Sequence, residues 1–126
     1  MKTRTRRFAA ALAFLILGPA VAAAQKLDAG LWTGTVTPPG EPAVAVTYDV
    51  KIAGDTISIT LNAAEHGSFP FSEIKIANGK LTFSWVAGPT PLKCELKPRE
   101  DAAWAGTCAD PDGATGEMVM VPPKKG

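Results

Sequence analysis

The 126-residue chain is poor in the side chains that most active sites use. It has one histidine, one tyrosine and two cysteines, and the cysteines do not form a C-x-x-C pair. One histidine and two separated cysteines do not complete a zinc site unless carboxylates contribute, and they do not suggest a catalytic triad. We therefore expect no metal, no cofactor and no enzymatic activity.

The polar groups that could be mistaken for catalytic residues lie in connecting segments. His66 is flanked by Glu65 and Ser68, but close neighbours in sequence rarely reach the geometry of a nucleophile, a base and an orienting group. We interpret His66 as a solvated loop residue. The paired carboxylates are interpreted as turn residues that bond local backbone. They are Glu100, Asp101, Asp110 and Asp112.

Long apolar runs are also missing. The run at residues 9–17 is shorter than the stretch of about 20 residues that spans a bilayer. It follows four basic residues and leads to V-A-A-A-Q, the order typical of a secretory signal peptide. We predict a signal peptide at 1–24, no membrane span, and a periplasmic or secreted protein. The pair Arg6-Arg7 leaves twin-arginine export open beside the general route.

The charge that remains after cleavage is mildly acidic. The leader holds four basic residues and no acidic ones, which leaves 13 − 4 = 9 basic against 12 acidic residues, a net charge of −3. Nucleic-acid binding requires a clustered excess of lysine and arginine, so we expect no nucleic-acid partner. Residues 25–126 are long enough for one domain.

The two cysteines are expected to pair, because thiols of an exported chain meet an oxidising compartment. A Cys94–Cys108 disulfide places Leu96 opposite Gly106 on the same face. It closes a loop of 15 residues, which contributes about 3 kcal/mol in the chain-entropy account.

Apolar residues recur at every second position through most of the chain, which predicts strands. Gly54-Asp55 and Asn78-Gly79 are suited to tight hairpin turns. The apolar parity changes between Phe71 and Ile74, so we expect a β-bulge near Ser72 and Glu73. Eight strands are predicted, at 30–37, 43–52, 56–62, 68–77, 80–86, 91–97, 102–108 and 114–121.

Eight antiparallel strands with short connections favour an up-and-down β-barrel, because closure removes exposed edges. A sandwich is the alternative, but its crossings require a long connection that the sequence lacks.

The stretch D-A-G-L-W-T-G-T-V at 28–36 adds a resemblance to this all-β prediction. Its Gly30-x-Trp32 resembles the start of the first strand in the calycin group, which includes lipocalins and avidin-like proteins. The longer pattern, through K-I-A-N-G-K-L-T-F-S-W and A-W-A-G-T-C, is similar to an uncharacterised barrel domain of exported bacterial proteins, sometimes found before α/β-hydrolases. The resemblance implies a structural role for Trp32, packed across one barrel end. The chain lacks the T-D-Y stretch and the final-strand arginine of standard lipocalins.

The predicted interior is bulky, so a filled core and a pocket at one open end both remain possible. For the pocket we predict ligand contacts by Tyr48, Phe83, Trp85 and Trp104. The full inward set comprises the cysteine pair and Trp32, Val36, Val44, Val46, Tyr48, Val50, Ile52, Ile57, Ile59, Leu61, Phe71, Ile74, Ile76, Leu81, Phe83, Trp85, Leu92, Leu96, Trp104, Met118 and Met120.

Two functions fit these expectations. The first is a binding module for a small apolar or amphipathic ligand at the barrel mouth. The second is interaction with an exported protein, such as inhibition of a periplasmic protease through the segment 25–28. The second rests on a resemblance to a family of bacterial metalloprotease inhibitors, exported barrels that insert their N-terminal segment into the protease. The disulfide here lies on other strands than in that family.

Overall fold

The computed structural model describes residues 27–124, and the predicted signal peptide at 1–24 lies outside this range. The described chain is all-β. Its strands are β2 (Gly30–Thr37), β3 (Val44–Ala53), β4 (Thr56–Ala63), β5 (Gly67–Pro70), β6 (Ser72–Ala77), β7 (Lys80–Ala87), β8 (Thr90–Pro98), β9 (Trp104–Ala109) and β10 (Thr115–Val121).

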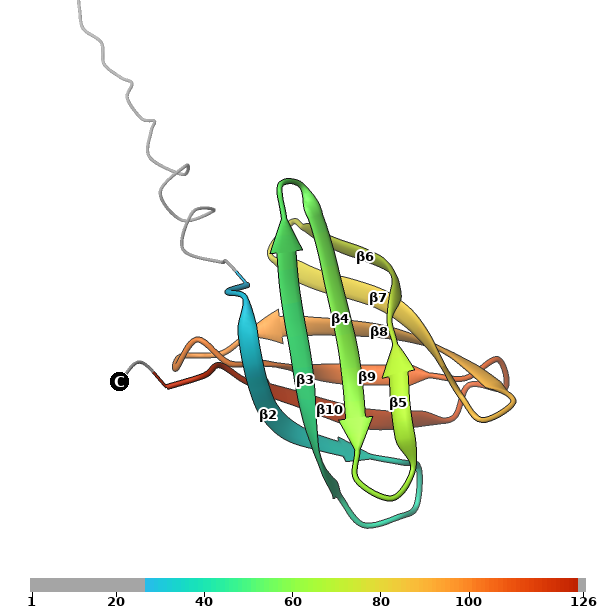
Figure 1. Ribbon diagram of the computed structural model, residues 1–126. Coiled ribbons are helices and arrows are strands. Elements are labelled where there is room, and N and C mark those ends of the chain that lie inside the picture. Colours follow the sequence, from blue (N-terminus) through green and yellow to red (C-terminus); the bar gives the residue numbers. More distant parts are fainter. Residues whose placement is uncertain (1–26, 125–126) are drawn as a thin grey trace, which may run out of the picture.

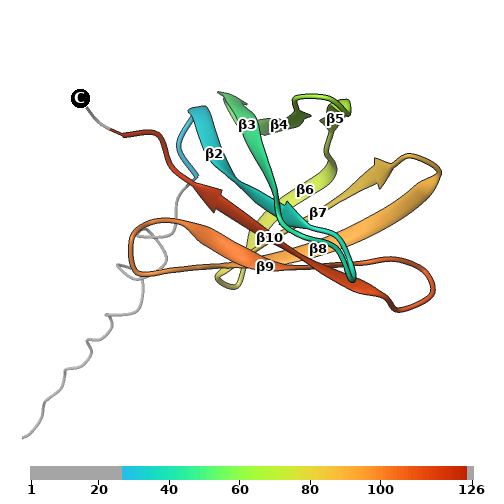
Figure 2. The same cartoon turned by 90° about the horizontal axis from the view of Figure 1, so that it is seen from below.

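The nine strands form one antiparallel sheet in the order β5-β4-β3-β2-β10-β9-β8-β7-β6 (Figure 1). Strands adjacent in sequence are neighbours in the sheet, except that β5 and β6 lie at its two ends, and β10 returns to pair with β2. Seen from below, the sheet curls around an interior and its two ends approach each other (Figure 2). The predicted up-and-down barrel is confirmed as a nearly closed one.

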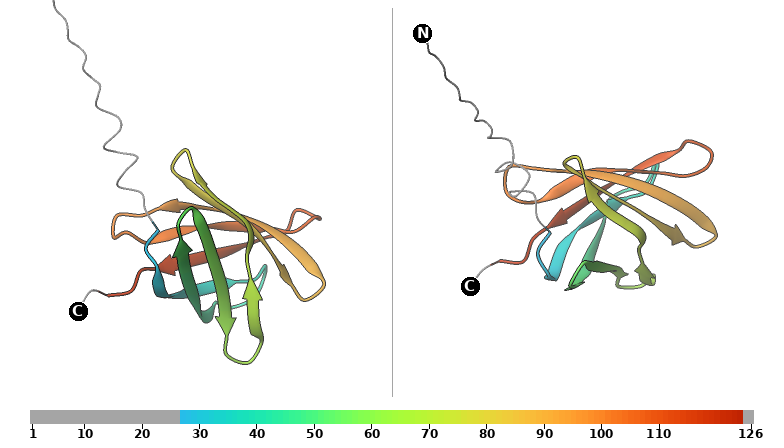
Figure 3. Two further views of the ribbon diagram at one scale, coloured as in Figure 1. Left: turned by 45° about the horizontal axis from the view of Figure 1, so that its top comes forward. Right: turned by 90° about the horizontal axis from the view of Figure 1, so that it is seen from above.

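The predicted single strand at 68–77 is wrong in detail, because it divides into β5 and β6 on either side of Phe71. β5 pairs with β4, whereas β6 pairs with β7, so this bent segment joins the two ends of the sheet (Figure 3). The Phe71 amide still donates to the Ile59 carbonyl at 2.9 Å. A strand that changes partner must break its register, which is why nine strands are found instead of eight.

The predicted β-bulge lies at this change of partner. The register of β6 against β7 shifts between Ser72 and Lys75, and Glu73 has a φ of 55°. The extra residue re-aims the strand, so that Phe71 and Ile76 both pack toward the core although their parities differ.

Both predicted hairpin turns are confirmed. Ile52 pairs with Ile57 across Gly54-Asp55, and Ile76 pairs with Leu81 across Asn78-Gly79. Positive φ values at Gly54, Asn78 and Gly79 fit residues that tolerate the left-handed region.

The barrel interior is filled mainly by the predicted inward residues. Trp32, Tyr48 and Trp104 are the largest of the side chains that are almost completely buried. Ile52 is a correction, since 42% of its surface is exposed. It lies beside the β3–β4 turn, at the tip of the hairpin and away from the centre of the barrel (Figure 1).

The strand directions define two ends of the barrel. The base comprises the turns at 54–55, 78–79 and 99–103, together with both ends of the described chain. The mouth comprises the connections at 38–43, 64–66, 88–89 and 110–114. Every hairpin therefore opens toward one end or the other, and the mouth lies opposite the described chain ends.

The predicted disulfide joins Cys94 on β8 to Cys108 on β9, which are directly opposite each other in the register. Leu96 faces Gly106, also as predicted. Such a bond fits a compartment more oxidising than the cytoplasm.

A membrane-crossing helix is not found between Leu27 and Lys124: no helix there has the necessary length and apolar character.

Candidate ligand pocket at the barrel mouth

The mouth contains two adjoining hollows, which we call the larger and the smaller lobe. The larger lobe has a volume of about 340 Å³ and the smaller about 270 Å³. These volumes are near the lower limit of roughly 300–1,000 Å³ for ligand sites. Five residues line both lobes: Val36, Pro38, Glu41, Trp85 and Ala87.

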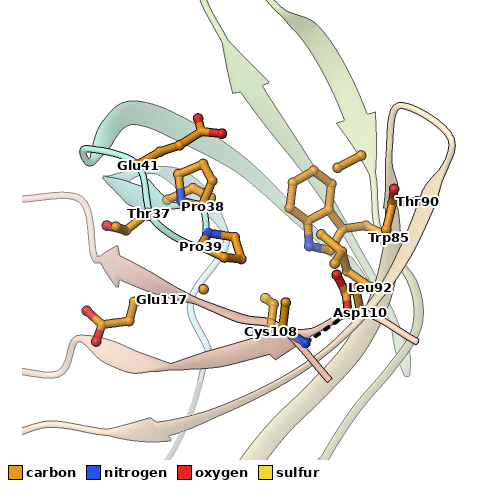
Figure 4. Close-up of a pocket in the computed structure, with 14 residues that line it drawn as sticks. Thr37, Pro38, Pro39, Glu41, Trp85, Thr90, Leu92, Cys108, Asp110 and Glu117 are labelled. Atoms are coloured by element: carbon orange, nitrogen blue, oxygen red, sulfur yellow. Dashed lines mark hydrogen bonds between the residues drawn. The ribbon is translucent and has the colours of Figure 1, made fainter. Parts of the chain in front are cut away.

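The larger lobe is bounded by loop residues on one side and by strand residues on the other. Pro38 and Pro39 form one wall, and Trp85 lies across from them with Leu92 next to it (Figure 4). Cys108 lies between these walls, so the disulfide strands β8 and β9 carry part of the floor. Proline at two successive positions restricts the backbone of this loop, which gives the pocket a stiff rim.

The smaller lobe is lined by the β3–β5 side of the barrel. Val46 and Leu61 are buried residues on this side of the smaller lobe. Phe69 packs edge-on against Trp85 with ring centroids 5.5 Å apart. Phe71 and Phe83 stack below, at 4.1 Å and 8°. This aromatic cluster fills the barrel under the joint between β5 and β6, and it limits both lobes to the mouth.

Trp85 has an unusual hydrogen-bonding state. Only 6% of its surface is exposed, and its indole Nε1 is buried without a hydrogen-bond partner among the described residues. Figure 4 shows the nitrogen edge of the ring turned toward the lobe that Pro39 and Cys108 also line. A buried N–H without an acceptor costs about 1–3 kcal/mol, so the wall shared by the two lobes has an unused donor.

The charged residues of the mouth are acidic. Glu41, Asp110 and Glu117 line the larger lobe, and within residues 27–124 no lysine or arginine lines either lobe. The Oδ1 of Asp110 accepts hydrogen bonds from the amides of Asp112 and Ala114, so this carboxylate is fixed at the rim.

The four predicted ligand-contact residues do not come together. Trp85 lines both lobes, whereas Tyr48 and Trp104 line neither. Tyr48 is buried near the middle of the barrel, where its hydroxyl shares a hydrogen bond between the Thr35 and Val119 carbonyls at 3.1 and 3.0 Å. Phe83 stacks on Phe71 beneath the mouth, and Trp104 begins β9 at the base.

Trp32, the third residue of β2, is buried toward the base. Its Nε1 donates to the Asp28 carbonyl at 2.8 Å, and Leu27 just before is buried in the core. Leu27 and Asp28 of the predicted protease-binding segment are thus attached to the barrel. Gln25 and Lys26 lie outside the described residues.

His66 is exposed, as expected for a loop residue, although it borders the smaller lobe. The nearby Ser68 hydroxyl bonds Asn62 instead, at 2.7 Å. Within residues 27–124, no group of three or more acidic, histidine or cysteine side chains is arranged to hold a metal ion.

The sequence prediction missed the loop side of the pocket. Pro38, Pro39 and Glu41 fall in the connection between the predicted strands 30–37 and 43–52, and turn composition does not indicate which way a loop folds. Val36 and Leu92 were assigned to the interior by parity, and both reach the larger lobe.

Comparisons with known proteins support the fold alone. No protein-family model and no curated protein sequence matches the chain. Among solved structures, a redesigned β-barrel is similar, with a TM-score of 0.62 over 82% of this chain and 95% of the other, at 8% identity. The likeness establishes a β-barrel and does not confirm membership of the calycin group.

Proposed function

We propose that this protein is a non-enzymatic, exported binding module that takes a small amphipathic ligand at its barrel mouth. The observation that carries the proposal is the Trp85 N–H, which has no hydrogen-bond partner within residues 27–124 and belongs to the wall that the two lobes share. Because this nitrogen is buried, a ligand oxygen reaches it only when the side chains around it shift. The hydrogen bond then formed would relieve a cost of about 1–3 kcal/mol.

The lining supports an apolar body for the ligand. Val36, Ala87 and Leu92 provide aliphatic surface around Trp85 in the larger lobe. Sites for small molecules are typically apolar with a few placed polar groups, and here the indole N–H is the placed donor. The volume of about 340 Å³ favours a short acyl chain over a long one.

The test is a substitution that fills the mouth and leaves its polar groups unchanged. Ala87 lines both lobes, whereas its neighbour Val86 is 53% exposed on the outer face. We expect Ala87→Phe to weaken binding of a neutral octanoyl ester at least about tenfold, because the new ring occupies the lobes. The matched control Val86→Phe should bind as the parent does, measured by calorimetric titration.

Thermal unfolding of both variants confirms that each retains the fold. Equal binding by Ala87→Phe and the parent, with both folded, would show that the mouth is not the site.

Native mass spectrometry of protein from its own cell envelope is a second test of the proposed function. A retained protein partner in place of a small molecule would favour the protein-interaction function.

A further inference from the structure

We infer that the mouth selects amphipathic ligands by charge, accepting cationic or neutral head groups and rejecting carboxylates. This inference rests on the proposed function and specifies the ligand class of the same pocket. Three features that lie together support it: an apolar pocket, the buried Trp85 N–H without a partner among the described residues, and a rim whose charged residues are acidic.

The asymmetry of charge follows from the loop sequences. The mouth connections hold four carboxylates and neither lysine nor arginine: Glu41, Glu65, Asp110 and Asp112. Counting His66 as neutral, these loops have a net charge of −4. Of these four, Glu41 and Asp110 line the larger lobe, and Glu117, on β10, is the third carboxylate of that lining. Figure 4 shows the head group of Glu117 directed away from Trp85.

Basic residues gather instead at or near the base. Arg99 lies in the 99–103 turn, Lys80 begins β7, and Lys97 precedes the end of β8. Lys80 pairs with Glu95 at 3.3 Å, so it is directed toward the outer face of the sheet. The positive charge of the described chain is thus largely separated from the mouth.

The physical consequence concerns the head group of a bound molecule. Its apolar body occupies the lobes, an ester carbonyl lies near the Trp85 N–H, and the head group remains at the rim. Clefts lined by charges of one sign focus the potential, because the low-dielectric walls exclude solvent. A cation at the rim is attracted, whereas a carboxylate meets like charge.

The experiment uses three octanoyl esters that share one body and differ only in head group. They are octanoylcholine, which is cationic, monooctanoylglycerol, which is neutral, and the octanoyl ester of glycolic acid, which is anionic. Each is titrated calorimetrically below its critical micelle concentration. At low ionic strength we expect octanoylcholine to bind about tenfold or more tightly than the anionic ester. This ratio should fall toward one as salt screens the rim.

Two charge-matched variants locate the effect. Glu41→Gln with Asp110→Asn neutralises two rim carboxylates while Asn keeps an oxygen for the turn, and it should reduce the preference to about threefold. Asp55→Asn with Glu100→Gln changes the net charge equally at the base, and it should leave the preference unchanged.

The outcomes separate the inference from the proposed function. If the neutral ester does not bind, the proposed function fails. If the neutral ester binds but the anionic ester binds as tightly as octanoylcholine, the charge inference alone is wrong. Equal effects of the mouth and base variants would also overturn it, because they would indicate a general effect of net charge.

Discussion

Tyr48 links the first and last strands of the described chain, β2 and β10, through its side-chain hydroxyl. Its hydroxyl bonds the carbonyls of Thr35 on β2 and Val119 on β10, two strands that are far apart in sequence. Burial raises the pKa of the Tyr48 hydroxyl well above its ordinary value of 10.0. Ionising this group would remove its donor and place a charge in the core.

The raised pKa predicts alkaline destabilisation. Below pH of about 10, Tyr48 is protonated in both states and its contribution to stability is complete. Above that pH, the unfolded chain loses the proton while the folded chain keeps it, so the free energy of unfolding falls by up to about 1.4 kcal/mol per pH unit. Tyr48→Phe should be less stable than the parent at neutral pH, by about 1–3 kcal/mol. Its free energy of unfolding should also fall less steeply as the pH rises, because it lacks the ionisable hydroxyl.

Denaturant unfolding at several alkaline pH values measures how steeply the free energy of unfolding falls with pH in the parent and in Tyr48→Phe. Because the chain has a single tyrosine, tyrosinate absorbance reports Tyr48 alone. The absorbance should rise together with unfolding. A rise in the folded protein near the ordinary tyrosine pKa would contradict the burial of this hydroxyl.

At the scale of the element, β2 depends on a close approach to β10. A Cβ added at Gly34 would lie 1.8 Å from the Val119 carbonyl oxygen and 3.2 Å from Tyr48 Cε2. β2 curves strongly along its length (Figure 1). Glycine is therefore required here for packing, since its φ is not in the left-handed region that the turn glycines adopt.

Gly34→Ala should consequently cost more than about 3 kcal/mol of stability, because the clash is with backbone that cannot yield without breaking the β2–β10 pairing. Gly40→Ala is the control. Gly40 has open space around it and a φ of 71°, so its cost should be about 1 kcal/mol. Chemical denaturation measures the stability of the two variants. Equal losses of stability would show that β2 and β10 do not approach so closely at Gly34.

The strands themselves were predictable because the parity of apolar residues and the two hairpin turns depend on local sequence. The division at Phe71 was not, since it arises from the need to pair with β4 before the bend and with β7 after it. The bulge at Glu73 was indicated by the parity change, but its role in joining the two ends of the sheet depends on the whole barrel.

At the scale of the whole molecule, the mouth combines residues that no single motif contains. Parity identified Trp85 as inward but could not tell whether it lay at the base, in the middle or at the mouth. Tyr48 and Trp104 were grouped with it for their aromatic character, and the barrel places them at other depths. The loop wall from Pro38 to Glu41 required the three-dimensional course of the chain.

The most direct measurement is the indole N–H resonance of Trp85 in a ¹H–¹⁵N spectrum, assigned by its loss in Trp85→Phe. Titration with monooctanoylglycerol should move this signal downfield as the N–H gains an acceptor, while the signal of Trp32, already bonded to the Asp28 carbonyl, stays in place. A Trp85 signal that does not move at ligand saturation would contradict a binding site at the mouth.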